Sequence, residues 1–257
     1  MSIEARLCSV AEILPMRELY RDEMNCQITH DSLCARDGWV HPYLLTLDGV
    51  PAGYVLLAIG GPWTDKPTAV EYYVFEKYLT RAFDLFEQFI STSGAQYIEI
   101  QSNATLLTNV LHAWSPDAVS EKIVFHDRFT TSLPSNGAVL KRVTSLEETM
   151  QFVERRQGCA DWQLEVDGIP VATGGICFHY NRPYGDIYMG VNGTYRRRGY
   201  GSYLVQELKR ICYEELNTKP CARCSPANVK SRKTLQKAGF VPCAHILTGS
   251  IKLPEPD

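Results

Sequence analysis

The stretch DIYMGVNGTYRRRGYGSYLVQELKRICYEEL, residues 186–216, decides how the chain is interpreted. It opens with six residues, 186–191, whose alternation predicts a β-strand. It closes with apolar residues at helical spacing from Ser202 to Leu216, which predicts an amphipathic helix. A polar turn and a segment rich in arginine and glycine, Arg196–Gly201, lie between them. The sequence therefore predicts a strand, a loop and a helix in direct succession.

This loop has the composition of a phosphate site. The first N–H groups of a helix have no partner inside the helix, and that end carries about half a positive charge. Gly199 and Gly201 allow the backbone to approach phosphate oxygens. A flexible turn with solvated arginines remains the alternative. A Rossmann loop would need a third glycine after Gly201, and a P-loop would need Gly-Lys-Ser/Thr.

The two halves of the chain follow the same order of elements. Asp48-Gly49 and Asp167-Gly168 each separate two apolar runs, and Asp-Gly supplies the positive φ angles of a tight hairpin turn. A connector composition over 130–137 separates the halves. The fold class is therefore α/β (α+β) with domains 1–136 and 137–257, and a single larger α+β domain is the alternative. The expected helix, strand and helix after the hairpins are 82–91, 97–101 and 105–114, then 202–216, 221–225 and 228–238.

Composition and charge narrow the function classes. A net charge of −3 and a pI near 6.1 give no general attraction to nucleic acid, and no stretch approaches the ~20 apolar residues of a membrane span. Nine cysteines at scattered spacing predict free buried thiols and, with no signal peptide, a cytoplasmic location. Cys221 and Cys224 form a CxxC in a predicted strand, where they would face opposite sides, so no metal site is expected.

The RxxGxG pattern at Arg196, Gly199 and Gly201, after a strand ending in Val191, closely resembles motif A of the GNAT acetyltransferases. A second block, from Asn228 to a closing Gly239-Phe240, resembles the next block of that family. The resemblance covers most of 138–250. It implies two GNAT-like domains, each a mixed, mostly antiparallel sheet flanked by helices. The corresponding loop of the first half, 76–83, contains no glycine, which implies a degenerate copy that does not bind the cofactor's phosphates.

The resemblance also implies acetyl-CoA as co-substrate and places it on particular residues. The pantetheine arm would lie beside the strand ending at Val191, near Asn228 and Ser231, and a backbone N–H near 189–191 would polarise the thioester. Asn228 could equally be a helix N-cap, with Gly239 as the C′ residue. The full set of expected cofactor-binding residues is Met189, Val191, Arg196, Arg197, Arg198, Gly199, Tyr200, Gly201, Ser202, Asn228 and Ser231.

The catalytic residues are less clearly marked. Many family members have a tyrosine acid where this sequence has Leu235, so that role is vacant or filled from elsewhere. Asp186 is the candidate base, and Tyr188 could donate a proton, although a half-buried core tyrosine is the alternative. His179 and Tyr180 could reach the same cleft.

The resemblance implies an N-acetyltransferase that acts on an amine of a small molecule or peptide, and charge and composition predict neither nucleic acid nor membrane as a partner. A catalytically inactive acyl-CoA-binding regulatory module is the competing hypothesis, and a scaffold with a relic loop is the third. The acceptor (an amino acid, polyamine, aminoglycoside-like compound or protein N-terminus) and the oligomeric state stay open.

Overall fold

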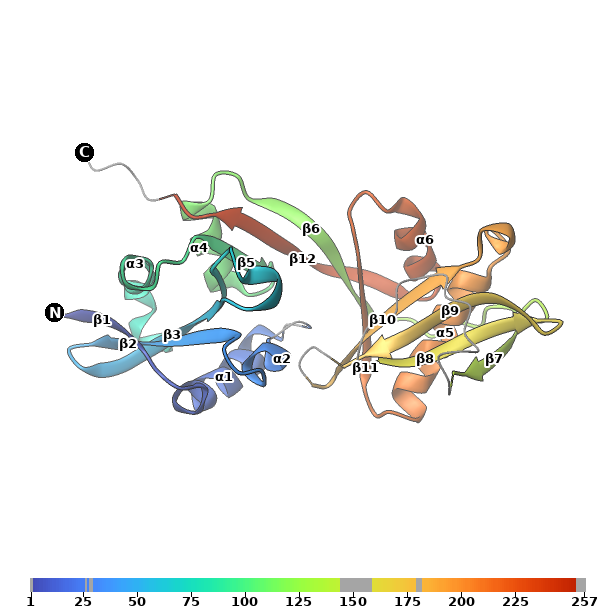
Figure 1. The fold of residues 1–257 in the computed structure, drawn as a ribbon, viewed down its shortest axis with the longest axis horizontal. Coiled ribbons are helices and arrows are strands. Elements are labelled where there is room, and N and C mark those ends of the chain that lie inside the picture. Colours follow the sequence, from blue (N-terminus) through green and yellow to red (C-terminus); the bar gives the residue numbers. More distant parts are fainter. Residues whose placement is uncertain (1, 26, 28–29, 144–158, 179–181, 253–257) are drawn as a thin grey trace. The chain divides into compact units, whose positions relative to one another are not determined.

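The computed structural model describes residues 2–25, 27, 30–143, 159–178 and 182–252. Contacts divide the chain into two compact units (Figure 1). The first unit comprises residues 1–121 and 244–257, and the second comprises residues 122–243.

The first unit is a mixed sheet in the strand order β1-β2-β3-β4-β5-β12. Its neighbouring strands β1 to β4 pair antiparallel, whereas β4 and β5 pair parallel. Asp48 and Gly49, with φ of 48° and 79°, form the predicted hairpin turn. The elements are β1 (Ile3–Leu7), α1 (Val10–Met24), α2 (Asp31–Cys34), β2 (Val40–Leu47), β3 (Val50–Ala58), η1 (Gly61–Trp63), β4 (Thr68–Val74), η2 (Glu76–Arg81), α3 (Ala82–Ser93), β5 (Tyr97–Gln101) and α4 (Thr105–Trp114).

The second unit repeats this plan in the strand order β6-β11-β10-β9-β8-β7. Here β10 and β11 are the parallel pair, and Asp167 and Gly168 form the hairpin turn with φ of 52° and 77°. Both units confirm the predicted class of mixed, mostly antiparallel sheets flanked by helices. The elements are β6 (Val119–Asp127), β7 (Val139–Arg142), β8 (Cys159–Val166), β9 (Ile169–Cys177), β10 (Tyr184–Val191), η3 (Gly193–Tyr195), α5 (Tyr200–Glu214), β11 (Lys219–Cys224), α6 (Val229–Lys237) and β12 (Phe240–Ser250).

Each unit has its own hydrophobic core. In the second unit, Leu204, Leu208 and Ile211 of α5 are buried against the sheet, as the 3.6-residue period predicts. Ile187 and Met189 of β10 pack into the same cluster. This face of β10 is therefore covered by helix, and the residues between them on the strand point to the other face.

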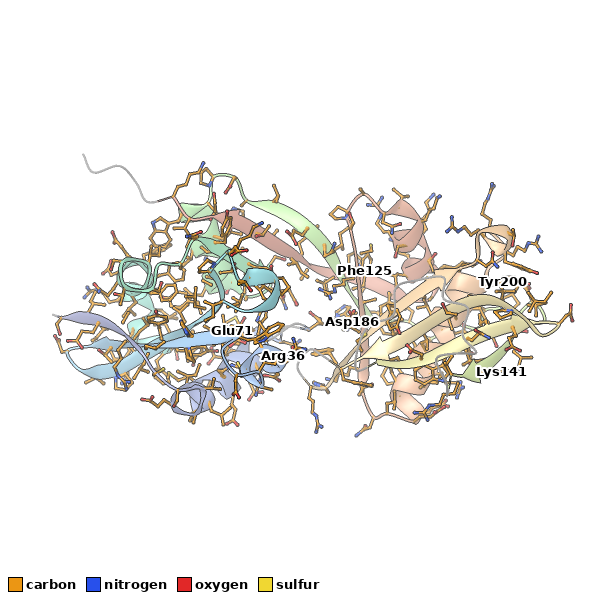
Figure 2. The ribbon with its side chains drawn as sticks, viewed as in Figure 1. Arg36, Glu71, Phe125, Lys141, Asp186 and Tyr200 are labelled. Carbon is orange, nitrogen blue, oxygen red and sulfur yellow. The ribbon has the colours of Figure 1, made fainter. Side chains whose placement is uncertain are left out.

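A buried ion pair links α1 and β4 in the first unit (Figure 2 labels Glu71). Arg17 of α1 donates from Nε and Nη2 to the two carboxylate oxygens of Glu71 on β4, at 2.8 and 2.7 Å. Tyr54 on β3 and the His30 backbone N–H also donate to Glu71. Burial alone would raise the pKa of Glu71, but Arg17 and these hydrogen bonds hold that pKa well below its usual value.

The contact-defined units separate inside two strands. Strands β6 and β12 each contribute residues to both units, because the units separate after Glu121 and again after Cys243. The end of β12 pairs with β5, from Ile246 opposite Gln101 to Ser250 opposite Tyr97. This pairing is distant in sequence, so local patterns carry no sign of it. The domains 1–136 and 137–257 stay a prediction.

The cysteines follow the sequence prediction in part. Six of the described cysteines form no disulfide: Cys8, Cys34, Cys212, Cys221, Cys224 and Cys243. The prediction is wrong for Cys177, which is disulfide-bonded. Strand register brings Cys177 opposite Cys159 in the backbone of the β8–β9 pair, and spacing along the chain does not reveal such a register.

The described residues contain no group of three or more His, Cys, Asp or Glu side chains that could hold a metal ion. None of the described helices is long and apolar enough to span a membrane.

Candidate functional site

The loop between β10 and α5 ends in an open helix N-terminus. The Asn192 side chain accepts the Thr194 N–H at 3.1 Å and holds the short turn η3. Arg197 and Gly199 then adopt positive φ angles of 65° and 91°, and α5 begins at Tyr200. In the described part of the chain, no side chain caps this helix. The first-turn N–H groups therefore remain available to a bound acceptor.

A cavity of about 220 Å³ adjoins this helix start. Arg197, Arg198 and Lys237 contribute three positive charges to it, and its described lining residues include no carboxylate. Asn136 also lines it and donates from Nδ2 to the Arg198 carbonyl oxygen at 2.9 Å, which braces the loop. The cavity suits an anion, because cationic side chains and the positive end of a helix meet there. The sequence places Asn136 in the predicted connector, and no neighbouring residue indicates that it contacts the loop.

Strands β10 and β11 separate beside this loop. Their register runs from Tyr184 opposite Lys219 to Ile187 opposite Ala222, and β10 continues to Val191. On the other side, β10 stays paired with β9 as far as Val191, and the Asn192 N–H donates to the Val171 carbonyl oxygen at 2.9 Å.

In an antiparallel pair of strands, the backbone N–H groups of successive residues point alternately toward the partner strand and away from it. Because Asn192 bonds to β9, Gly190 and Tyr188 do so as well, at every second residue. The N–H groups of Met189 and Val191 therefore point to the edge where β11 has parted. These are the two strand residues that the sequence predicts beside the thioester.

Gly201 packs against the sheet. A Cβ atom at this position would lie 2.7 Å from Met189 Cε, 3.2 Å from Val191 Cγ2 and 3.4 Å from Thr234 Cγ2. A Cβ at 201 would therefore have to displace the flexible end of Met189, and a side chain larger than alanine would also crowd Val191 and Thr234. The sequence predicts phosphate access for this glycine, with a close helix-to-sheet contact as a further possible requirement, and the structure shows that contact.

The predicted catalytic residues Asp186 and Tyr188 share the face of β10 that points away from α5. Asp186 is only 1% exposed, and its Oδ2 lies 3.5 Å from Arg223 Nε on β11 (Figure 2). The Tyr188 hydroxyl donates to Oδ1 of Asp161 on β8. Asp161 is half-buried, so it is the more accessible of the two carboxylates. Sequence analysis missed Asp161 and Arg223, because only strand pairing brings them to β10.

The second predicted block forms helix α6. Asn228 is its N-cap, and its side chain accepts the Ser231 N–H at 3.0 Å. Gly239 follows the helix with a φ of 91°, so the capping interpretation of both residues is confirmed. Leu235, where the family often has tyrosine, is buried in the core. His179 and Tyr180 lie outside the described residues.

The second unit has a mixed sheet whose parallel strands β10 and β11 separate beside an open helix N-terminus. This arrangement agrees with the acetyltransferase fold that the resemblance implies. Residues 128–240 match the model of the acetyltransferase (GNAT) family. The matched segment includes the loop and the parted strands described above.

Solved structures extend the fold to the whole chain. An acetyltransferase of the GNAT family from Colwellia psychrerythraea aligns with a TM-score of 0.75 at 12% identity, covering 98% of this chain and 100% of that one. A tandem GNAT protein from the clavulanic acid biosynthesis pathway aligns at 0.60 and 12% identity, over 99% and 100%. A GCN5-related N-acetyltransferase from Sphaerobacter thermophilus aligns at 0.63 and 14% identity, over 99% and 97%. The search of curated proteins found no match.

Proposed function

We propose that the second unit binds acetyl-CoA and transfers its acetyl group to an amine of a small molecule or peptide. The observation that carries this proposal is the uncapped N-terminus of α5 beside a cavity with three cationic side chains. A pyrophosphate is the part of coenzyme A that such a site recognises. GNAT membership of residues 128–240 supports the same ligand.

The proposed position of acetyl-CoA follows the loop and the strand. Backbone N–H groups of residues 197–202 hold the pyrophosphate, and Arg196 to Arg198 supply charge. Arg196 Nε lies 3.4 Å from the Val191 carbonyl oxygen, which ties the loop to the strand end. The pantetheine arm lies along Met189 and Val191, next to the N-terminus of α6 at Asn228 and Ser231.

The proposed reaction is a direct attack of the amine on the thioester carbonyl carbon. A C–N bond forms as the C–S bond breaks, and one backbone N–H, that of Met189 or that of Val191, donates to the negatively charged carbonyl oxygen. The neutral amine loses one proton, which Asp186 or the Asp161–Tyr188 pair accepts, and the leaving thiolate takes up one proton. Asp161 positions the Tyr188 hydroxyl, since the tyrosine donates its hydrogen bond to that carboxylate.

We also propose that the first unit is a degenerate copy without a coenzyme A site. In place of the glycine loop, η2 leads directly into α3, and the Ala82 N–H bonds to the Leu79 carbonyl oxygen. The side chain of Glu71 on β4 is buried in its ion pair with Arg17. Calorimetry with acetyl-CoA should therefore give one site per chain, and two equivalent sites would contradict this proposal.

An acyl-CoA-binding regulatory module is the second candidate, favoured by Leu235 in the position of the family tyrosine. Release of free thiol from acetyl-CoA, measured over a panel of amines, separates the two. The transferase should release thiol only when an acceptor amine is present. A protein that binds acetyl-CoA but releases no thiol with any amine would favour the regulatory module.

A further inference from the structure

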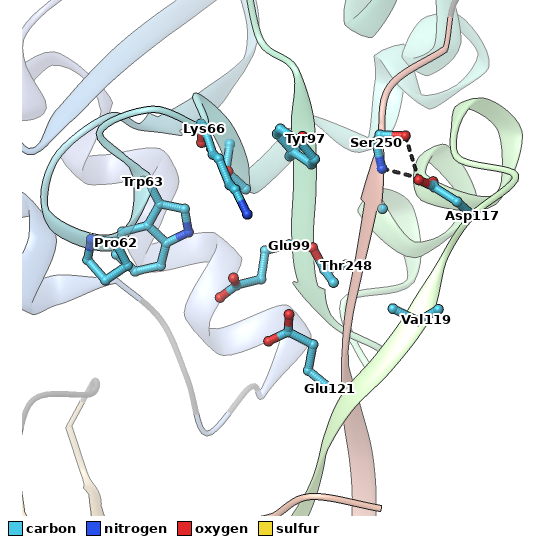
Figure 3. Close-up of a pocket in the computed structure, with 12 residues that line it drawn as sticks. Pro62, Trp63, Lys66, Tyr97, Glu99, Asp117, Val119, Glu121, Thr248 and Ser250 are labelled. Atoms are coloured by element: carbon cyan, nitrogen blue, oxygen red, sulfur yellow. Dashed lines mark hydrogen bonds between the residues drawn. The ribbon is translucent and has the colours of Figure 1, made fainter.

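The first unit contains a cavity of about 340 Å³ that the proposed transfer does not use (Figure 3). Its floor is one face of the sheet. Strands β5 and β12 pair antiparallel, with Tyr97 opposite Ser250 and Glu99 opposite Thr248. Residues two apart on a strand share a face, so these four side chains stand together. Glu121 of β6 also lines the cavity.

Aromatic rings form part of the wall. Trp63 ends η1, where its backbone N–H donates to the Gly60 carbonyl oxygen at 3.2 Å and its carbonyl oxygen accepts the Lys66 backbone N–H at 3.0 Å. The His30 ring meets the Trp63 ring edge-on, with 6.4 Å between centroids. These contacts hold Trp63 in place at the cavity. Tyr97 presents a second ring from the floor.

The charge of the lining is negative. Three carboxylates, Glu99, Asp117 and Glu121, stand against one ammonium, Lys66, which leaves a net charge of −2. Asp117 accepts both the Ser250 hydroxyl and N–H, at 2.6 and 2.9 Å, and these hydrogen bonds lower its pKa. Figure 3 shows the Glu99 and Glu121 carboxylates directed toward the same space. Such a lining disfavours an anion and favours a cation.

The chain itself shows which kind of cation fits. The Lys66 ammonium lies 5.7 Å from the centroid of the Tyr97 ring, so an alkylammonium group already lies over an aromatic ring of this cavity. Small-molecule sites occupy about 300–1,000 Å³, and this cavity falls within that range. The described residues include no group suited to a metal ion. An organic cation therefore fits the cavity better than a metal ion.

From the cavity, its charge and its aromatic wall, we propose that the first unit binds a small aliphatic amine carrying two ammonium groups. One ammonium group would meet Glu99 and Glu121, and the second would lie against Trp63. This site is separate from the acetyl-CoA loop, and the proposal does not depend on acetyl transfer.

The test is calorimetric titration of the full chain at low salt with 1,4-diaminobutane, compared with 1,4-butanediol. The diol has the same length and no charge. We expect the diamine to bind one site per chain and the diol to give no measurable binding. The double variant Glu99→Gln/Glu121→Gln should lower the diamine affinity at least tenfold, and Trp63→Leu should lower it severalfold.

Glu87→Gln is the matched control, because Glu87 is an exposed residue of α3 in the same unit and outside the cavity. It should leave the diamine affinity unchanged, and thermal unfolding should show that the variants are folded. Absence of diamine binding to the wild-type chain would overturn the proposal. Equal affinity for diol and diamine would overturn it as well, as would undiminished binding by a folded double variant.

Discussion

Replacing Gly201 with valine tests the proposal that the loop at the start of α5 binds acetyl-CoA. The new Cβ would stand 2.7 Å from Met189 Cε and 3.2 Å from Val191 Cγ2, and the two added methyl groups need further space. Met189 can swing its flexible end away, whereas the shorter Val191 side chain has less freedom. Overpacking of this kind costs about 1–3 kcal/mol, so we expect the free energy of unfolding to fall by that amount.

The same change should weaken acetyl-CoA binding. Displacing α5 from β10 shifts the first-turn N–H groups, and one or two charge-assisted hydrogen bonds of about 1.5–3 kcal/mol each would be lost. Affinity should therefore fall at least tenfold, since about 1.4 kcal/mol corresponds to a factor of ten.

Urea unfolding and calorimetry measure the two effects separately, and Gly201→Ala is the control. Alanine adds one methyl group and gains about 1 kcal/mol of helix propensity, so its stability should stay close to that of the wild type. If Gly201→Val lost stability but bound acetyl-CoA with unchanged affinity, the role of this loop as a phosphate site would be refuted.

Three further changes test the catalytic face and the first unit. Tyr188→Phe should lower kcat about tenfold or more and leave the calorimetric acetyl-CoA affinity near wild type, whereas equal kcat would exclude the hydroxyl from proton transfer. Asp186→Asn should likewise slow turnover more than it weakens cofactor binding. Unchanged turnover of this variant with every accepted amine would remove Asp186 from the mechanism. Because the pKa of Glu71 is held below its ordinary value of 4.5, its contribution to stability is present above about pH 4.5 and is lost as the pH falls below it. Urea unfolding from pH 6 to pH 3 should show this loss, and Glu71→Gln should flatten the slope.

Local patterns predicted most of the fold. The Asp-Gly turns predicted both hairpins, because a primed turn needs two residues with positive φ. The spacing of Leu204, Leu208 and Ile211 predicted the buried face of α5. These features depend on residues a few positions apart, and the sequence displays them directly.

The features that escaped prediction depend on pairing between distant strands. Asp161 reaches Tyr188 only because β8, β9 and β10 lie side by side in a particular register. Asn136 contacts the Arg198 carbonyl oxygen across 62 positions of sequence. The direction of Gly201 toward Met189 depends on how α5 sits on the sheet. Composition and periodicity do not predict such contacts.

The pairing of β12 with β5 has a consequence for the order in which the chain folds during synthesis. Among the described residues, β5 pairs with β4 at Thr68 and Ala69, and the register with β12 covers all of β5, from Tyr97 to Gln101. When only the first half of the chain has been synthesised, residues 246–250 do not yet exist. Until they emerge, β5 presents an open edge to other nascent chains, and open edges promote association. A fragment ending near residue 136 should therefore aggregate more readily than the full chain.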